Sequence, residues 1–241
     1  TNLRHGRTDV AVFEIGKGYG TDDHPDRPTR EWWRLAFALT GSGEAPAWNR
    51  TARPYDLDDA KGLVELLASR LGRPAVAYDG LSGDPTLHPG RAATIRTDGV
   101  VVGRIGELHP VLLDALELRA DRVVVGEIAV AGLAAGRLVD AKVSQPSRHP
   151  DVERDLAVVV STDRPAAAVA ATIASHGGDL LRSVTLFDSY RGKPLGEREV
   201  SLAYRLVFAA EDRTLTEAEV ATAIEAITAG LVTDVEGRLR A

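Results

Sequence analysis

The second half of the chain alternates strand-like and helix-like segments in an order that few folds can accommodate. Two helices are predicted there. The first is capped by Asp163 with Pro165 in its first turn, and the second starts at the capping box formed by Thr216 and Glu219. Four segments have the composition and apolar alternation of strands: residues 156–160, 184–190, 199–208 and 235–240. The predicted order is therefore β-α-β-β-α-β.

This order is that of the ferredoxin-like fold, in which both helices cover one face of the sheet and leave the other face open. Alternation along the strands sorts residues between the two faces. In the third strand the apolar set should face the helices: Val200, Leu202, Tyr204, Leu206 and Phe208. Ser201, Ala203 and Arg205 then belong to the open face. In the second strand we expect Phe187 in the core, so that Asp188 and Tyr190 point outward.

The open face should bring Ala157, Ser201, Asp188 and Tyr190 close together, because the first and third strands are central and the second strand flanks the third. A tyrosine ring can stack on a nucleic-acid base, and a carboxylate can accept two N–H groups from the edge of guanine. The small side chains leave room for a base. Phosphate contacts are expected from nearby cations: Arg191, Lys193, Arg198 and Arg205. The alternative is an ordinary half-exposed sheet face, with Asp188 as a turn former at the end of a strand.

The first half has no regular β-α rhythm, which argues against a dinucleotide-binding fold. Strands are predicted at residues 9–15, 32–39, 75–78, 92–96, 100–105 and 123–130. A helix over residues 56–71 should be capped by Asp56 and present an apolar face of Leu63, Leu66, Leu67 and Leu71. Residues 16–30, rich in glycine, proline and charge, are predicted to be a loop. Thr97-Asp98-Gly99 signals a hairpin, and His109-Pro110 opens a short helix. The chain is thus predicted to be an α+β protein with a boundary near residue 143.

Composition narrows the possible functions. The formal net charge is −6, and neither half has the basic excess typical of a nucleic-acid-binding domain, so any such binding needs a local site. There is no cysteine, no apolar run long enough to span a membrane and no export signal. There is also no methionine, which suggests a fragment of a longer protein.

Two short sequence motifs that contain histidines could indicate catalysis. His88, Glu107 and His109 could serve as metal ligands or as an acid–base pair. A proline follows each of the two histidines, which favours turn and helix-start geometry instead. Gly16-Lys17-Gly18-Tyr19-Gly20 lacks the spacing and the Lys-Ser/Thr pair of a phosphate-binding loop.

Both halves resemble one family. The second half carries Arg154-Asp155-Leu156-Ala157, Leu186-Phe187-Asp188-Ser189-Tyr190, Ser201-Leu202-Ala203 and Asp212-Arg213-Thr214-Leu215-Thr216 at matching spacings. These phrases resemble the ferredoxin-fold anticodon-binding domain of bacterial phenylalanyl-tRNA synthetase beta subunits. The first half resembles the catalytic-like module of the same subunits through Asn2-Leu3-Arg4, Val12-Phe13-Glu14-Ile15-Gly16, His88-Pro89-Gly90-Arg91 and Gly106-Glu107-Leu108-His109-Pro110.

The resemblance implies two domains. Residues 1–142 would be an antiparallel-sheet, class II synthetase-like domain, truncated at its N-terminus and non-catalytic, that docks on the alpha subunit. Residues 143–241 would bind the anticodon of tRNA(Phe), and the positions that match the family's contacts to the first anticodon base, a guanine, are Asp188, Tyr190, Ser201 and Ala157. A net-acidic domain should bind an isolated anticodon loop weakly.

The resemblance also implies a cytoplasmic (αβ)2 heterotetramer that charges tRNA(Phe) at an active site on the alpha subunit. ATP and Mg²⁺ are expected for the whole enzyme, and no catalytic residue, cofactor or metal is expected in this chain. Two other classes remain open on the sequence alone. One is an enzyme that uses His88, Glu107 and His109, and the other is a regulatory protein that binds a small molecule through its ferredoxin-like domain.

Overall fold

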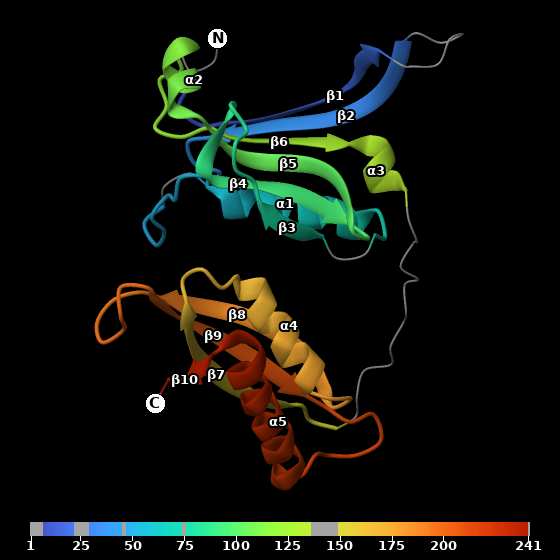
Figure 1. The fold of residues 1–241 in the computed structure, drawn as a ribbon, viewed down its shortest axis with the longest axis vertical. Helices are drawn as coiled ribbons and strands as arrows, with labels where there is room; N and C mark the ends of the chain where they lie inside the picture. Colours follow the sequence, from blue (N-terminus) through green and yellow to red (C-terminus); the bar gives the residue numbers. More distant parts are fainter. Residues whose placement is uncertain (1–6, 22–28, 45–46, 74–75, 136–148, 241) are drawn as a thin grey trace. The chain divides into compact units, whose positions relative to one another are not determined.

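The computed structural model describes residues 7–21, 29–44, 47–73, 76–135 and 149–240. The chain divides into two compact units, Thr1–Lys142 and Val143–Ala241 (Figure 1). The motif Asn2-Leu3-Arg4 lies outside the described residues, as does the predicted boundary near residue 143. No helix in the described part of the chain is long and apolar enough to cross a membrane.

The first unit is built on a six-stranded antiparallel sheet with the strand order β1-β2-β6-β5-β4-β3. The strands are β1 (Val10–Thr21), β2 (Thr29–Thr40), β3 (Ala77–Gly80), β4 (Leu87–Thr97), β5 (Val100–Leu108) and β6 (Val124–Ala129). The helices are α1 (Leu57–Arg70), α2 (Pro110–Ala115) and α3 (Val130–Ala134). All six predicted strands are present. The turn between β4 and β5 has positive φ at Asp98 and Gly99, as the hairpin signal requires.

The glycine-rich segment predicted as a loop is partly strand. Residues 16–21 continue β1 and residues 29–30 begin β2, while residues 22–28 lie outside the description. Gly18 pairs directly with Trp32, and a Cβ built on Gly18 or Gly20 would lie 2.6 or 2.7 Å from the indole ring. The glycines therefore make space for a cross-strand tryptophan, which the composition of the segment alone does not reveal.

Helix α1 has the predicted capping box, with Asp56 as the cap, but the predicted apolar face is not the one that meets the core. The buried residues are Ala60, Val64 and Ala68, whereas Leu63 and Leu66 are exposed. A face of small residues lets the helix approach the sheet closely, and Figure 1 shows α1 lying against it. Leu63, Leu66 and Leu67 line a groove shared with β1, and of the four predicted leucines only Leu67 also packs against the core.

The second unit is a four-stranded antiparallel sheet with two helices on one face (Figure 1). The strands are β7 (Val152–Ser161), β8 (Leu181–Tyr190), β9 (Glu199–Phe208) and β10 (Arg238–Leu239), in the order β10-β7-β9-β8. The helices are α4 (Ala166–His176) and α5 (Glu217–Val235). The first and third strands of the unit are central, which confirms the ferredoxin-like prediction.

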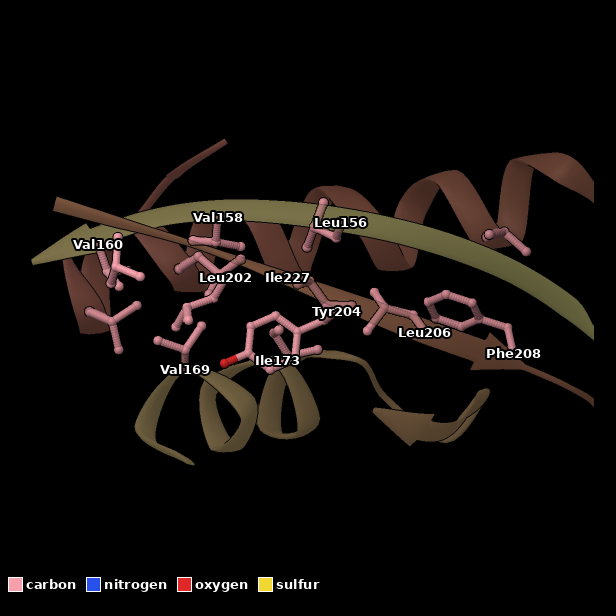
Figure 2. Close-up of a cluster of buried hydrophobic side chains, with 14 of the residues drawn as sticks. Leu156, Val158, Val160, Val169, Ile173, Leu202, Tyr204, Leu206, Phe208 and Ile227 are labelled. Carbon is pink, nitrogen blue, oxygen red and sulfur yellow. The ribbon is translucent and has the colours of Figure 1, made fainter. Parts of the chain in front are cut away.

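The core of this unit lies between the sheet and the two helices. Figure 2 shows β7 and β9 side chains directed toward Val169 and Ile173 of α4 and Ile227 of α5. The predicted alternation in β9 is confirmed, because all five residues of the apolar set are buried. The Tyr204 hydroxyl donates a hydrogen bond to the Ala166 carbonyl at 2.8 Å, and burial raises the pKa of Tyr204 to about 12.

The start of α4 differs from the prediction. Pro165 is the cap residue and no side chain caps the helix. Asp163 lies instead in the turn after β7 and forms an ion pair with Arg198 at 2.8 Å. The backbone N–H of Arg164 bonds the Ser161 carbonyl, so a turn occupies the residues before the helix and carries Asp163 away from it.

The start of α5 gives a pH-dependent prediction. Glu219 accepts hydrogen bonds from Arg213 and from Thr216, and these contacts hold the pKa of Glu219 at about 2, below its ordinary value of 4.5. Its contribution to stability is thus complete above about pH 5 and is lost as the pH falls toward 2. Glu219→Gln should lower the free energy of unfolding at pH 7, and the difference from the wild type should shrink between pH 5 and pH 2. Urea unfolding at several pH values measures this difference.

Glu225→Gln, on an exposed part of the same helix, is the control. A deficit that stays constant with pH would contradict the assignment.

Candidate nucleic-acid interface

The open face of the second unit is the sheet face opposite α4 and α5. Residues directly opposite each other on paired strands project to the same face. Asp188 of β8 pairs with Ala203 of β9, which pairs with Ala157 of β7. Tyr190 pairs with Ser201 in the adjacent row. The structure therefore brings together the four residues that the sequence grouped as a base pocket.

Phe187 was predicted to be a core residue, and this prediction is wrong. Leu186 pairs with Tyr204 and Asp188 with Ala203, so Phe187 is an extra residue in a β-bulge. The bulge turns Phe187 toward the open face, where its ring lies 5.2 Å from the guanidinium carbon of Arg205. Its side chain is half exposed.

Tyr190 is held at the edge of the open face by two contacts. Its hydroxyl donates a hydrogen bond to the Lys193 carbonyl at 2.8 Å. The guanidinium carbon of Arg240 lies 5.0 Å from the centroid of its ring, which is cation–π distance. The sequence-based prediction missed Arg240, although the alternation Arg238–Leu239–Arg240 beside the first strand would have placed two arginines on this face.

Arg240 and Tyr190 come from opposite edges of the sheet, so they meet above the two central strands. Ser201, opposite Tyr190 on β9, is only 3% exposed, although it belongs to the open face as predicted. A base can therefore reach the Ser201 hydroxyl only after neighbouring side chains move.

Asp188 and Arg205 differ in whether their charged groups already have partners. The Asp188 carboxylate has no hydrogen-bond or ion-pair partner among the described residues. Arg205 donates two hydrogen bonds to Asp155, of 2.9 and 3.0 Å, and lies 3.8 Å from Glu153. These hydrogen bonds lower the pKa of Asp155, so it stays ionised at neutral pH. Asp188 is thus available to a ligand, whereas the Arg205 charge is already matched.

The remaining predicted phosphate contacts lie in the connection from β8 to β9. Arg191 and Lys193 are exposed there, and neither side chain is ion-paired with another described residue. Arg198 is paired with Asp163 and Arg238 with Glu199. Arg191 and Lys193 are therefore the cations nearest to Tyr190 in sequence that remain available for phosphates.

His88, Glu107 and His109, the residues of the alternative catalytic interpretation, each form hydrogen bonds or ion pairs with neighbouring protein groups. Glu107 is buried, accepts a hydrogen bond from Arg91 at 2.5 Å and forms an ion pair with Arg122 at 3.1 Å. His109 caps α2 by accepting from the Val111 N–H, and His88 accepts from the Gly90 N–H. Within the described ranges no three potential metal ligands converge.

The first unit contains an exposed apolar groove of about 840 Å³ between β1, β2 and α1. Its wall includes Val12, Phe13, Ile15, Leu63 and Leu66, and the Phe13 side chain is 74% exposed. Trp32 of β2, in contrast, is half-buried against Gly18 and Gly20.

Comparison with known proteins matches both units to the family that their sequence motifs resemble. Residues 1–130 match the family model described as the phenylalanyl tRNA synthetase beta chain CLM domain, and residues 147–240 match the ferredoxin-fold anticodon binding domain. The phenylalanine–tRNA ligase beta subunit of Symbiobacterium thermophilum is 42% identical over 215 residues, which is 88% of this chain and 23% of that protein. The Moorella thermoacetica subunit is 43% identical over 222 residues, 90% of this chain and 27% of that protein. The chain thus spans about a quarter of the length of these curated relatives.

Proposed function

The chain belongs to the phenylalanyl-tRNA synthetase beta chain family, and we propose that its second unit binds the anticodon loop of tRNA(Phe). The observation that carries this proposal is the grouping of Asp188, Tyr190, Ser201 and Ala157 on the open sheet face. An aromatic ring, an available carboxylate and a floor of small residues suit an unpaired guanine. Arg191 and Lys193 can contact the phosphates beside it.

The first unit is proposed to dock on the alpha subunit of an (αβ)2 heterotetramer. Support comes from the apolar groove around Phe13, because exposed apolar surfaces of this kind mark interaction sites. We expect the chain to form a complex with an alpha subunit that persists at high salt. We expect Phe13→Asp to weaken this complex.

Aminoacylation itself is proposed to take place on the alpha subunit, in the cytoplasm, with ATP and Mg²⁺ bound outside this chain. Support comes from two acidic side chains of the first unit whose charges are already matched by arginine. Asp84 pairs with Arg104, and Glu127 pairs with both Arg34 and Arg104.

Binding to a hairpin RNA with the tRNA(Phe) anticodon loop tests the second unit. Tyr190→Ala should weaken binding roughly 5- to 150-fold, because base–aromatic stacking is worth about 1–3 kcal/mol. Fluorescence anisotropy of a labelled hairpin measures the change. Tyr19→Ala removes an exposed tyrosine of the first unit and should leave the affinity unaltered. Equal binding by the wild type and Tyr190→Ala would overturn the assignment of the pocket.

A further inference from the structure

We infer that Phe187 and Arg205 form a second base-stacking subsite on the open face, for the unpaired nucleotide next to the base held at Tyr190. This inference rests on the proposed function. It extends the site from one base to two and assigns Phe187 and Arg205 roles that differ from those the sequence predicts.

The first observation is the position of Phe187. A regular β8 would place Phe187 opposite Asp188 and Tyr190, on the helix side of the sheet, where an aromatic ring can be buried. The bulge places it on the open face instead, 51% exposed. Bulges commonly re-aim a side chain next to a functional site. An exposed phenylalanine beside Asp188 gives a second flat surface on the same face as Tyr190.

The second observation is that the Phe187 ring is paired with a fixed guanidinium. Arg205 lies 5.2 Å from the ring centroid and is oriented by its two hydrogen bonds to Asp155. Guanidinium planes and aromatic rings are both surfaces on which unpaired RNA bases stack. The two groups are already positioned, so stacking on them requires little ordering of side chains.

The third observation is that the same arrangement occurs twice on this face. Tyr190 with Arg240 and Phe187 with Arg205 are both aromatic–guanidinium pairs, at 5.0 and 5.2 Å. The small residues Ala157, Ala203 and Ser201 lie between them in the registers of β7, β8 and β9. Each pair gives one base a stacking surface.

The spacing between the pairs decides how many bases they hold. Tyr190 and Phe187 are three residues apart on β8, or roughly 10 Å at about 3.4 Å per residue in a regular strand, and the bulge shortens this distance. Each ring can therefore take its own base, with the two bases splayed apart as in a single-stranded loop.

The subsite should act through stacking and not through charge. Arg205 is neutralised by Asp155 and lies near Glu153, so it releases few counterions on binding RNA. Phe187→Ala should therefore weaken binding without altering the slope of log affinity against log salt. Lys193→Ala should reduce that slope, because its ammonium has no ion-pair partner among the described residues.

The test uses the whole chain and hairpin RNAs that carry the fluorescent base 2-aminopurine at the first anticodon position or at either neighbouring position. We expect Phe187→Ala to weaken binding roughly 5- to 150-fold, as for the loss of one stacked base. We also expect it to abolish the fluorescence quenching of 2-aminopurine at one neighbouring position while the first position stays quenched. Phe187→Trp, which keeps a stacking ring, should restore both the affinity and the quenching.

The outcomes separate this inference from the proposed function. If Tyr190→Ala weakens binding and Phe187→Ala does not, the second subsite is overturned and the anticodon pocket stands. If Phe187→Ala weakens binding but leaves quenching at both neighbouring positions intact, Phe187 has only a structural role and the subsite is again overturned. If the wild-type chain shows neither binding nor quenching, the proposed function fails and the inference fails with it.

Discussion

Leu206→Ala should lower the free energy of unfolding of the second unit by about 2–5 kcal/mol. Leu206 is fully buried on a central strand and is packed between the sheet and both helices (Figure 2). Its removal loses the transfer free energy of the side chain and leaves a cavity, because neighbours such as Phe208 and Ile173 are held by the sheet and by α4 and collapse only in part.

Two spectroscopic probes can assign the effect to one unit. All three tryptophans, Trp32, Trp33 and Trp48, belong to the first unit, so their fluorescence reports on it alone. In urea, Leu206→Ala should move the far-UV circular dichroism transition of the second unit to lower concentration and leave the tryptophan transition in place. Leu186→Ala removes the same side chain from an exposed site on β8 and should cost at most about 1 kcal/mol. An equal shift of both transitions would contradict independent unfolding of the units.

The fold of the second unit was predictable because its signals are local. Alternation in β9 assigns five apolar residues to one face, and all five are buried. The capping box at Thr216 and Glu219 forms as its spacing requires, and Leu215 and Val220 beside it are buried. Such patterns depend only on the period of the strand and on the first turn of the helix.

The features that escaped prediction depend on contacts between distant segments. Gly18 lies in a strand because Trp32 fills the space beside it, and that tryptophan is on another strand. The bulge at Phe187 interrupts the alternation without a glycine or proline to mark it. The leucine stripe of α1 has helical period, but the smaller residues Ala60, Val64 and Ala68 allow the closer approach to the sheet.

In the candidate site, too, some features follow from local sequence patterns and others depend on contacts between distant segments. The grouping of Asp188, Tyr190, Ser201 and Ala157 follows from alternation and strand order, both of which the sequence carries. The contact between Arg240 and Tyr190, by contrast, requires two side chains from opposite edges of the sheet to meet. Whether Ser201 is open or covered thus depends on side-chain conformation, which periodicity does not report.

Asp188→Asn should remove most of the preference for guanine at the first anticodon position. The carboxylate can accept two N–H groups from the guanine edge, while an asparagine amide offers one acceptor and one donor group. A good two-point contact of this kind discriminates between bases by about 1–3 kcal/mol, so the ratio of affinities for two bases should fall roughly 5- to 150-fold. Asp188 has no other partner among the described residues, so the substitution should leave the fold unchanged.

The measurement is a competition between two hairpin RNAs that differ only at this position, one with guanine and one with inosine, which lacks the exocyclic amino group. The ratio of affinities is the correct quantity, because loss of a negative charge should strengthen binding to any RNA. Glu197→Gln removes the same charge from the exposed connection between β8 and β9 and serves as the matched control. It should raise both affinities and keep their ratio. If Asp188→Asn also keeps the ratio, the Asp188 carboxylate does not read the base, and Tyr190 alone would then provide stacking without selectivity.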